Sequence, residues 1–217
     1  MTDQSYTPAL GYFGLTGLYD RAIAVLTRES TWRPMVLEIL APRDGETIVD
    51  LGAGTGSLAI LIKRAAPQAR ILAVDPDSAV REIGEAKARA ASVDIEFITA
   101  MGNEQIPTTP AGSVDAVVCS LVLHQCPLEM KRAIIANAAR MIKPRGRFIL
   151  ADYGTQPTWL TRLGFLLVQT LDGFEATEHN RRGVIPELID AAGFTVNEVA
   201  GRVDTPSGAI SVWRAQL

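Results

Sequence analysis

The sequence predicts an α/β fold: a Rossmann-like, doubly wound, seven-stranded sheet in a three-layer sandwich. Three observations predict it. Short apolar runs alternate with helix-like segments, the first run leads into a glycine-rich turn, and two further strand candidates close the chain. Apolar residues at successive positions are typical of strands in a parallel sheet that is covered on both faces. We therefore expect five parallel strands and a C-terminal antiparallel hairpin.

The apolar runs give the strand positions. The parallel strands are expected at Thr47–Leu51, Arg70–Asp75, Ile95–Thr99, Ala116–Leu121 and Arg147–Asp152. Two later runs, Phe194–Val203 and Ala209–Arg214, are separated only by the short turn Asp204–Gly208. A turn of this length predicts a hairpin between them.

Helix-like segments lie between the strands. They are expected at Ser57–Ala66, from a cap at Asp77 or Ser78 to Ala91, at Leu128–Ile142 and at Ile185–Ala192. Upstream, Gly17–Leu40 predicts a helix that is broken near Ser30–Pro34.

The segment Thr158–Phe174 predicts a further helix with one apolar stripe. The stripe consists of Leu160, Leu163, Leu167, Leu171 and Phe174, and Arg162 and Gln169 occupy the other side. We interpret it as core or lid, or alternatively as an apolar wall for a lipid-like acceptor. The expected organisation is an N-terminal helical lid over residues 1–44 and a main domain over 45–217, with a helical insertion at about 156–180.

Composition narrows the classes of function. The chain has 217 residues, of which 47% are apolar and 21% charged, and its net charge is −3. No run of Lys or Arg exceeds two residues, so we do not expect nucleic acid as a partner. No apolar run approaches the roughly 20 residues needed to span a bilayer, and the first residues lack a signal pattern, which favours a cytoplasmic protein. Cys119 and Cys126 have no zinc-type spacing, so reduced thiols and no metal are expected. The oligomeric state is not indicated.

The glycine-rich turn is the strongest functional signal. Gly52, Gly54 and Gly56 directly follow the first strand and open the first helix. Such a turn lets the backbone approach a ligand where a Cβ atom would collide, at the end of a parallel sheet where ligands bind. The alternative is a tight turn without a ligand, but three alternating glycines exceed what a turn needs.

The residues around the turn indicate which cofactor it holds. The dinucleotide motif G-x-G-x-x-G requires a glycine where this chain has Ser57, and Asp50 precedes the turn. A carboxylate repels a pyrophosphate and attracts an ammonium group, so S-adenosylmethionine (SAM) is favoured over NAD. Asp75 ends the second strand, where a carboxylate can accept both hydroxyls of a ribose.

At this point the chain resembles the class I SAM-dependent methyltransferases, in particular the ubiquinone/menaquinone-biosynthesis-like group. Four stretches carry the resemblance: VDLGAGTG at 49–56, AVDPD at 73–77, VDAVVCSLVLHQCP at 114–127 and RMIKPRGRFILADYG at 140–154. The family transfers a methyl group from SAM to a small molecule and releases S-adenosylhomocysteine. The motifs are specific for the cofactor and say little about the acceptor.

The resemblance implies roles for named positions. Asp50, Gly52, Ala53 and Gly54 would face the methionine part of SAM, and Asp75 and Pro76 the ribose and adenine. Met101, Gly102 and Asn103 occupy the adenine loop, although this chain lacks the aspartate that the family usually has there. Ser120 and Leu121 would pack beside the sulfonium, and Tyr19 belongs to an N-terminal segment that relatives place over the cofactor.

Three polar residues are candidates for acting on the acceptor. His124 follows the fourth strand, Asp152 ends the fifth, and His179 lies in the polar stretch Glu178–Arg182. Histidine is the side chain best suited to act as a base near neutral pH. The alternatives are structural or capping histidines. Two competing functions stay open: a non-catalytic SAM-binding regulatory module and an NAD-dependent oxidoreductase.

Overall fold

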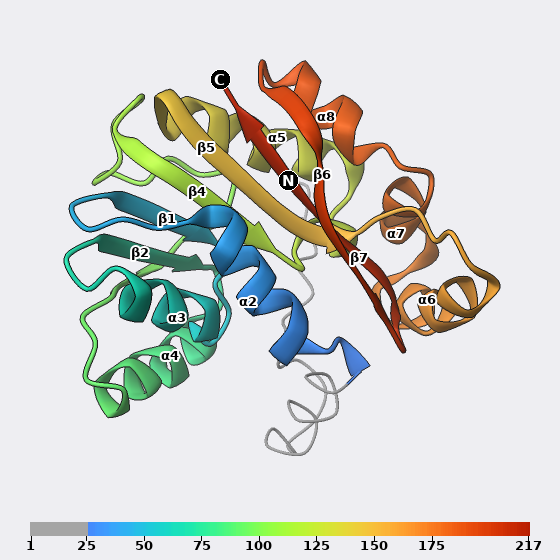
Figure 1. The fold of residues 1–217 in the computed structure, drawn as a ribbon, viewed down its shortest axis with the longest axis horizontal. Helices are drawn as coiled ribbons and strands as arrows, with labels where there is room; N and C mark the ends of the chain where they lie inside the picture. The colour runs from blue at the N-terminus through green and yellow to red at the C-terminus, as the bar shows by residue number, and fades with distance from the viewer. Residues whose placement is uncertain (1–25) are drawn as a thin grey trace, which may run out of the picture.

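The structure, a computed structural model, describes residues 26–217, except for the side chains of residues 196–198. Its centre is a seven-stranded sheet with the strand order β3-β2-β1-β4-β5-β7-β6 (Figure 1). The strands are β1 Thr47–Leu51, β2 Arg70–Asp75, β3 Glu96–Thr99, β4 Val114–Ser120, β5 Ile142–Tyr153, β6 Thr195–Thr205 and β7 Gly208–Gln216. Strands β1 to β5 are parallel, and β7 pairs antiparallel with both β5 and β6. The predicted fold class is confirmed.

Helices cover both faces of the sheet. They are α2 Glu29–Leu40, α3 Ser57–Ala65, α4 Ser78–Ala90, α5 Leu128–Met141, α6 Trp159–Asp172, α7 Phe174–Arg181 and α8 Ile185–Ala191, with the short 3-10 helix η1 at Leu123–Gln125. Asp77 caps α4 as predicted, because its side chain accepts bonds from the N–H groups of Ala79 and Val80. No described helix is long and apolar enough to cross a membrane.

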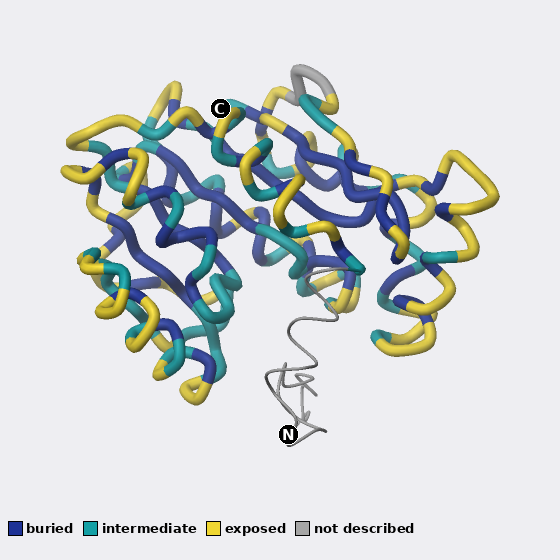
Figure 2. Tube along the Cα trace, turned by 60° about the horizontal axis from the view of Figure 1, so that its bottom comes forward, coloured by how far each residue is buried: buried dark blue, intermediate teal, exposed yellow. Residues whose placement is uncertain are grey.

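The strands alternate their side chains between two cores. In β1, Val49 and Leu51 belong to the core under α5 and α8, whereas Ile48 belongs to the core under α2 and α3. The buried centre of the molecule is this sheet, and the exposed segments surround it (Figure 2). Because the alternation continues along each strand, Asp50 lies on the α2 face and Asp152 on the α5 face.

The prediction that the upstream helix breaks near Ser30–Pro34 is wrong. Helix α2 runs through Pro34 without interruption, and the chain turns instead at Arg28, whose φ is 50°. Trp32, Val36 and Leu40 repeat at intervals of four residues and are all buried. This burial holds the helix together although Pro34 removes one backbone hydrogen bond.

The interpretation of the apolar stripe on α6 as core is also wrong. Leu160, Leu163, Leu167, Leu171 and Phe174 are between 45% and 65% exposed. The buried side of α6 carries Thr161, Phe165, Val168 and Gln169 instead. Apolar residues lie on two sides of this helix, and the close packing of Gly164 on Pro206 selects the Phe165 side for the core. An exposed apolar face therefore remains on α6.

Candidate active site at the carboxyl ends of the parallel strands

The sequence-predicted site residues gather at one edge of the sheet. Strands β1, β2, β4 and β5 are parallel, so their last residues Leu51, Asp75, Ser120 and Tyr153 lie at the same edge. The loops that follow these strands hold the glycine turn and His124. Ligands of open α/β sheets bind at this edge.

The three glycines of the turn have different roles in the structure. All have positive φ, which side chains other than glycine rarely adopt. A Cβ atom at Gly52 would lie 2.1 Å from Cγ2 of Val122, and one at Gly56 would lie 2.9 Å from the ring of Phe97. At Gly54 a Cβ would meet nothing within 4 Å. Gly52 and Gly56 are thus required by packing, and Gly54 is the glycine that borders open space.

The backbone N–H groups of the turn are bonded within the protein. Gly52 and Ala53 both donate to the carbonyl of Val74, at 2.8 and 3.0 Å. Gly54 donates to Oδ2 of Asp75 at 2.9 Å. These bonds fix the turn against β2. A ligand would therefore contact the surface of the turn and not the N–H groups of these three residues.

Asp50 is a fully buried carboxylate without a partner. Neither of its oxygens has a hydrogen-bond partner among the described residues. Burial raises its pKa to about 7, with Arg33 on α2 acting in the opposite direction and Asp75 adding to the rise. A buried acid without a partner is costly and is found mainly where a ligand completes the site.

Asp75 is half-buried and oriented by two backbone donors. Its Oδ2 accepts from Gly54 and its Oδ1 accepts from Asp77 at 3.0 Å. Burial raises its pKa, although these two hydrogen bonds lower it. Each oxygen keeps a second lone pair for a further donor. The next residue, Pro76, is also half-buried.

The loop after β3 is closed by its own contacts. The N–H of Met101 donates to Oε2 of Glu104 at 3.1 Å, and the carbonyl of Gly102 accepts from Asn137 at 2.8 Å. Asn103 is exposed. The N–H of Ala100 donates to the carbonyl of Asp75, which places this loop beside the end of β2.

The loop after β4 begins with a strained residue. Ser120 ends β4, and Leu121 follows with a φ of 55° while its N–H donates to the carbonyl of Ala151. A left-handed conformation costs roughly 1–2 kcal/mol for a residue with a branched side chain. Such strain collects at functional sites.

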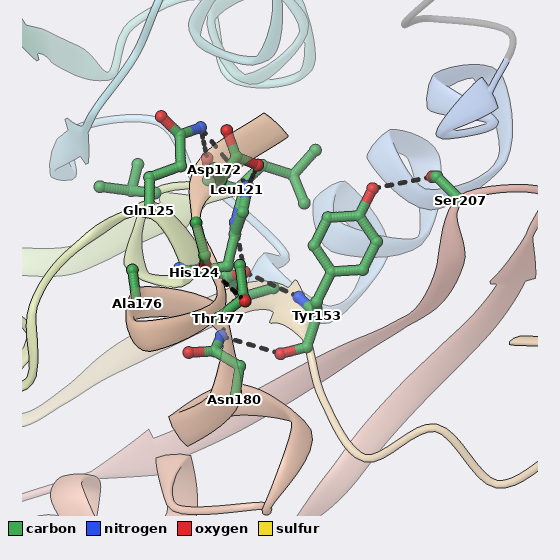
Figure 3. A network of polar contacts seen from close by, with 12 residues as sticks. Leu121, His124, Gln125, Tyr153, Asp172, Ala176, Thr177, Asn180 and Ser207 are labelled. Atoms are coloured by element: carbon green, nitrogen blue, oxygen red, sulfur yellow. Dashed lines mark hydrogen bonds and ion pairs between the residues drawn. The ribbon is translucent and has the colours of Figure 1, made fainter. Parts of the chain in front are cut away.

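His124 and Asp152 form a buried pair in that loop. Nδ1 of His124 lies 2.8 Å from Oδ1 of Asp152, and the imidazole meets the ring of Tyr153 edge-on at 5.0 Å between centroids. Oδ2 of Asp152 also accepts from the N–H of Leu123 at 2.7 Å. Figure 3 shows this network, with Asp172 and Gln125 on one side of His124 and Asn180 on the other.

A buried lysine ties this loop to α7. Nζ of Lys131 donates to the carbonyls of Leu123 and Ala176 and to Oδ1 of Asn180. Asn180 in turn donates to the carbonyl of Tyr153 at 2.9 Å. Burial lowers the pKa of Lys131 to about 8, against the attraction of Asp152. The network therefore connects η1, α5, α7 and β5.

Two predicted residues lie apart from this network or outside the described part. His179 on α7 is half-buried, its Nδ1 has no partner among the described residues, and no hydrogen bond joins it to His124. Its neighbour Asn180 is the residue of α7 that bonds to Lys131 and to the carbonyl of Tyr153. Tyr19 lies outside the described residues.

Sequence reasoning missed Asp172, Lys131, Asn180 and Arg33. One signal was available for Lys131: it precedes Ile134 and Ile135 by three and four residues, which places it on the buried face of α5. Asp172 and Asn180 gave no such signal, because their partners are at least 27 residues away in sequence.

Comparisons with known proteins point to one family for the stretch that holds most of these residues. Residues 48–146, which include the glycine turn, Asp75 and His124, match a family described as "Methyltransferase domain". The match covers a little under half of the chain. All the predicted cofactor-side residues except Tyr19 lie within it, whereas Asp152 and His179 lie beyond its end.

Curated relatives match longer stretches of the chain. A ubiquinone/menaquinone biosynthesis C-methyltransferase of Rubrivivax gelatinosus is 33% identical over 129 residues, which is 59% of this chain and 48% of the relative. A demethylmenaquinone methyltransferase of Clavibacter sepedonicus is 31% identical over 154 residues, 70% of this chain and 60% of the relative. The chain thus spans about half to three-fifths of the length of these relatives. The resemblance to the ubiquinone/menaquinone group is confirmed.

Solved structures share the fold. A geranyl diphosphate C-methyltransferase from Streptomyces coelicolor superposes with a TM-score of 0.70 at 17% identity, covering 96% of this chain and 86% of that one. A SAM-dependent methyltransferase from Aquifex aeolicus gives 0.63 at 16% identity, covering 85% and 89%. At these identities the likeness concerns the fold.

Proposed function

We propose that this chain binds SAM at the glycine turn and transfers its methyl group to a small apolar molecule, with S-adenosylhomocysteine as the product. The observation that carries the proposal is Asp50, a fully buried carboxylate without a hydrogen-bond partner among the described residues, four positions before Gly54, where the turn borders open space. The relatives named as methyltransferases support the same activity. Bound SAM would supply a methyl group on a sulfonium, which makes the carbon electrophilic.

The residues present fit this cofactor. Asp50 lacks a hydrogen-bond donor within residues 26–217, and the ammonium group of a methionine moiety would provide one together with a positive charge. We assign the methionine part of SAM to Asp50 and to the surface of Gly52, Ala53 and Gly54. The open side of Gly54 leaves room for the ligand, which a Cβ atom there would fill.

The remaining cofactor contacts follow from the same sheet edge. Asp75 keeps one lone pair on each oxygen for the ribose hydroxyls, with Pro76 beside it. We assign adenine to the loop Met101–Asn103, where the N–H of Met101 is already used by Glu104, so adenine would contact this loop mainly by packing. Ser120 ends β4 and Leu121 follows it. Both would line the methyl group.

His124 is the proposed base, and Asp152 orients it. Hydrogen bonds from the backbone N–H groups of Leu123 and Tyr153 hold Asp152, which then fixes Nδ1 of the imidazole. Nε2, which faces Asp172, is the atom proposed to take a proton from the acceptor. His179 stays a candidate contact to the acceptor. Methyl transfer needs alignment and a dry site, and His124 is only 4% exposed.

The acceptor is proposed to be apolar because of α6. Its exposed face includes Leu163 and Leu167, and the helix ends at Asp172, whose Oδ2 lies 3.5 Å from Nε2 of His124. An apolar surface that continues into a polar reaction centre fits a molecule with an apolar body and one reactive polar group. We keep the N-terminal segment 1–44 as the proposed lid and place the protein in the cytoplasm.

A methyl-transfer assay tests the proposal. The full chain is incubated with SAM labelled in its methyl group and with apolar acceptors, beginning with demethylmenaquinone reduced to its quinol. Label in the organic phase and an equal amount of S-adenosylhomocysteine are the expected result. A chain that binds SAM but labels no acceptor, in wild-type and His124→Gln forms alike, would favour a non-catalytic SAM-binding module.

An oxidoreductase that uses NAD is the other competing function. Asp50 stands against it, because a buried carboxylate beside the turn repels a pyrophosphate. Titration with NADH followed by nicotinamide fluorescence is expected to show no change.

A further inference from the structure

The two ring nitrogens of His124 contact carboxylates from two different elements. Nδ1 lies 2.8 Å from Asp152 at the end of β5, and Nε2 lies 3.5 Å from Oδ2 of Asp172 at the end of α6. A base needs one free nitrogen to accept a proton. In this arrangement neither nitrogen of His124 is free.

The two carboxylates are held very differently. Asp152 is fully buried and accepts hydrogen bonds from three backbone N–H groups and from Asn180, in addition to its contact with Nδ1 of His124. The Asp172 side chain is 25% exposed, and among the described residues its carboxylate bonds with His124 alone. Asp152 is therefore a fixed partner, and Asp172 is one that can leave.

Gly173, which directly follows Asp172, can act as a hinge. It separates α6 from α7 with a φ of 90°, and a Cβ atom there would meet nothing within 4 Å. On one side of this hinge, Asn180 of α7 bonds to Lys131 and to the carbonyl of Tyr153, which holds α7 to the core. On the other side, the outer face of α6 is exposed, and the helix is held to the core by its buried side. The positive φ of Gly173 can absorb a shift of the last residues of α6 relative to α7.

We propose that Asp172 is a positioning residue that covers the acceptor-facing nitrogen of His124 and that the acceptor displaces it. This proposal rests on the proposed role of His124 as a base. While Asp172 is in place, the imidazole carries protons on both nitrogens. When its carboxylate leaves, the proton on Nε2 passes to water. An acceptor hydroxyl then gives its proton to Nε2, its O–H electron pair stays on the oxygen, and Nδ1–H stays on Asp152.

The electrostatics of the pocket agree with this covered state. Burial by itself would lower the pKa of His124, but Asp152 and Asp172 outweigh it and raise the pKa to about 9. Among the described residues, the other titratable groups around the pair are Tyr153 on β5, Lys131 on α5, Cys126 after η1 and the buried Cys119 on β4. Gln125 also approaches Nε2, at 3.4 Å, but is neutral.

The imidazole of His124 can be observed directly, because the chain contains only two histidines. We would titrate the full chain with labelled histidine by NMR and assign the signals with His179→Gln. Asp172→Asn is expected to lower the pKa of His124 by at least one unit, and Asp172→Glu to restore most of it. Asp190→Asn, which changes an exposed acid on α8, is the matched control and should leave the titration unchanged.

A second readout uses diethyl pyrocarbonate, which modifies a free, unprotonated ring nitrogen. In the His179→Gln background at pH 7, Asp172→Asn should react at least about tenfold faster than its parent. An Asp172→Asn protein that is folded by circular dichroism, yet matches wild type in both titration and reactivity, would overturn the proposal. If Asp172→Asn fails to fold, Asp172→Ser decides: unchanged reactivity and titration without the carboxylate would equally contradict a cover at 3.5 Å.

Neither readout uses SAM or an acceptor. If SAM did not bind, the proposed function would be wrong, but the contact between Asp172 and His124 could still be measured. If Asp172→Asn left the titration of His124 unchanged, the proposed cover would be wrong, but SAM binding would be unaffected.

Discussion

The backbone N–H of Gly54 donates to Oδ2 of Asp75 at 2.9 Å, which joins the turn after β1 to the acid that ends β2. The cofactor side of the site is thus one connected unit. A change in the glycine turn moves the carboxylate that we assign to the ribose, although the two lie 21 residues apart in sequence.

Gly54→Ala and Gly52→Ala should separate binding from stability. Gly54→Ala adds a Cβ into open space at a φ of 53°, so it should cost about 1 kcal/mol of stability and weaken SAM binding at least about tenfold. Gly52→Ala collides with Val122 and should be the more destabilising of the two. Chemical denaturation and SAM calorimetry measure both effects. The roles assigned to the glycines would be wrong if Gly54→Ala bound SAM as tightly as wild type.

Asp50→Asn should stabilise the protein above neutral pH. The folded-state pKa of about 7 lies above the ordinary value of 3.8, so folding disfavours the ionised acid. The resulting loss of folding stability is absent below about pH 4, grows up to about pH 7 and is constant above it. At pH 8 the variant should gain roughly 2–4 kcal/mol in free energy of unfolding, and at pH 4 almost nothing. Asp94→Asn, which changes an exposed acid, is the control. An equal gain in the free energy of unfolding of Asp50→Asn at pH 4 and pH 8 would contradict a penalty for ionising the buried Asp50.

The same pKa predicts how SAM affinity depends on pH. An ionised Asp50 is needed to pair with the ammonium group, and at pH 6 only about one tenth of it is ionised before SAM binds. The dissociation constant should therefore be about tenfold larger at pH 6 than at pH 8. Asp50→Asn should lose this dependence. Calorimetry at the two pH values decides the point, and a flat profile in the wild type would argue against this pairing.

Lys131→Met should loosen α7. The substitution removes the donor to two carbonyls and to Asn180, all of them buried or half-buried, and should cost about 2–4 kcal/mol. In this variant, exchange of backbone amide hydrogens with solvent should become faster in α7 than in wild type, and by a larger factor than in β1. Lys143→Met, which removes a partly exposed ion pair with Asp115, is the control and should cost about 1 kcal/mol or less.

The exposed face of α6 should matter for the acceptor and not for the fold. Leu163→Gln with Leu167→Gln should change stability by less than about 1 kcal/mol, whereas Phe165→Ala, on the buried side, should cost about 3–5 kcal/mol. With demethylmenaquinol as the acceptor, the double variant should raise KM and leave kcat unchanged. A large loss of stability in the double variant would show that this face is covered.

The sheet could be predicted from the sequence because its signals are local. Strands β1 and β2 lie at the predicted bounds, since their residues are apolar at successive positions and turns flank them. The cap at Asp77 was also predicted, because a cap and the N–H groups it binds are two and three residues apart.

The rest depended on contacts between distant segments. Which side of α6 is buried is decided by Pro206 and Gly208 near β7, and periodicity cannot choose between two apolar sides. The pairing of Lys131 with Asn180 spans 49 residues, and the contact of Asp172 with His124 joins two elements that no spacing rule connects.

The central claim is that SAM binds beside Asp50. Calorimetric titration of the full chain with SAM at pH 8, run in parallel with Asp50→Asn, tests it most directly. We predict saturable binding of one SAM per chain and at least about tenfold weaker binding by the variant. No binding by the wild type, or equal affinity in the two proteins, would contradict the account.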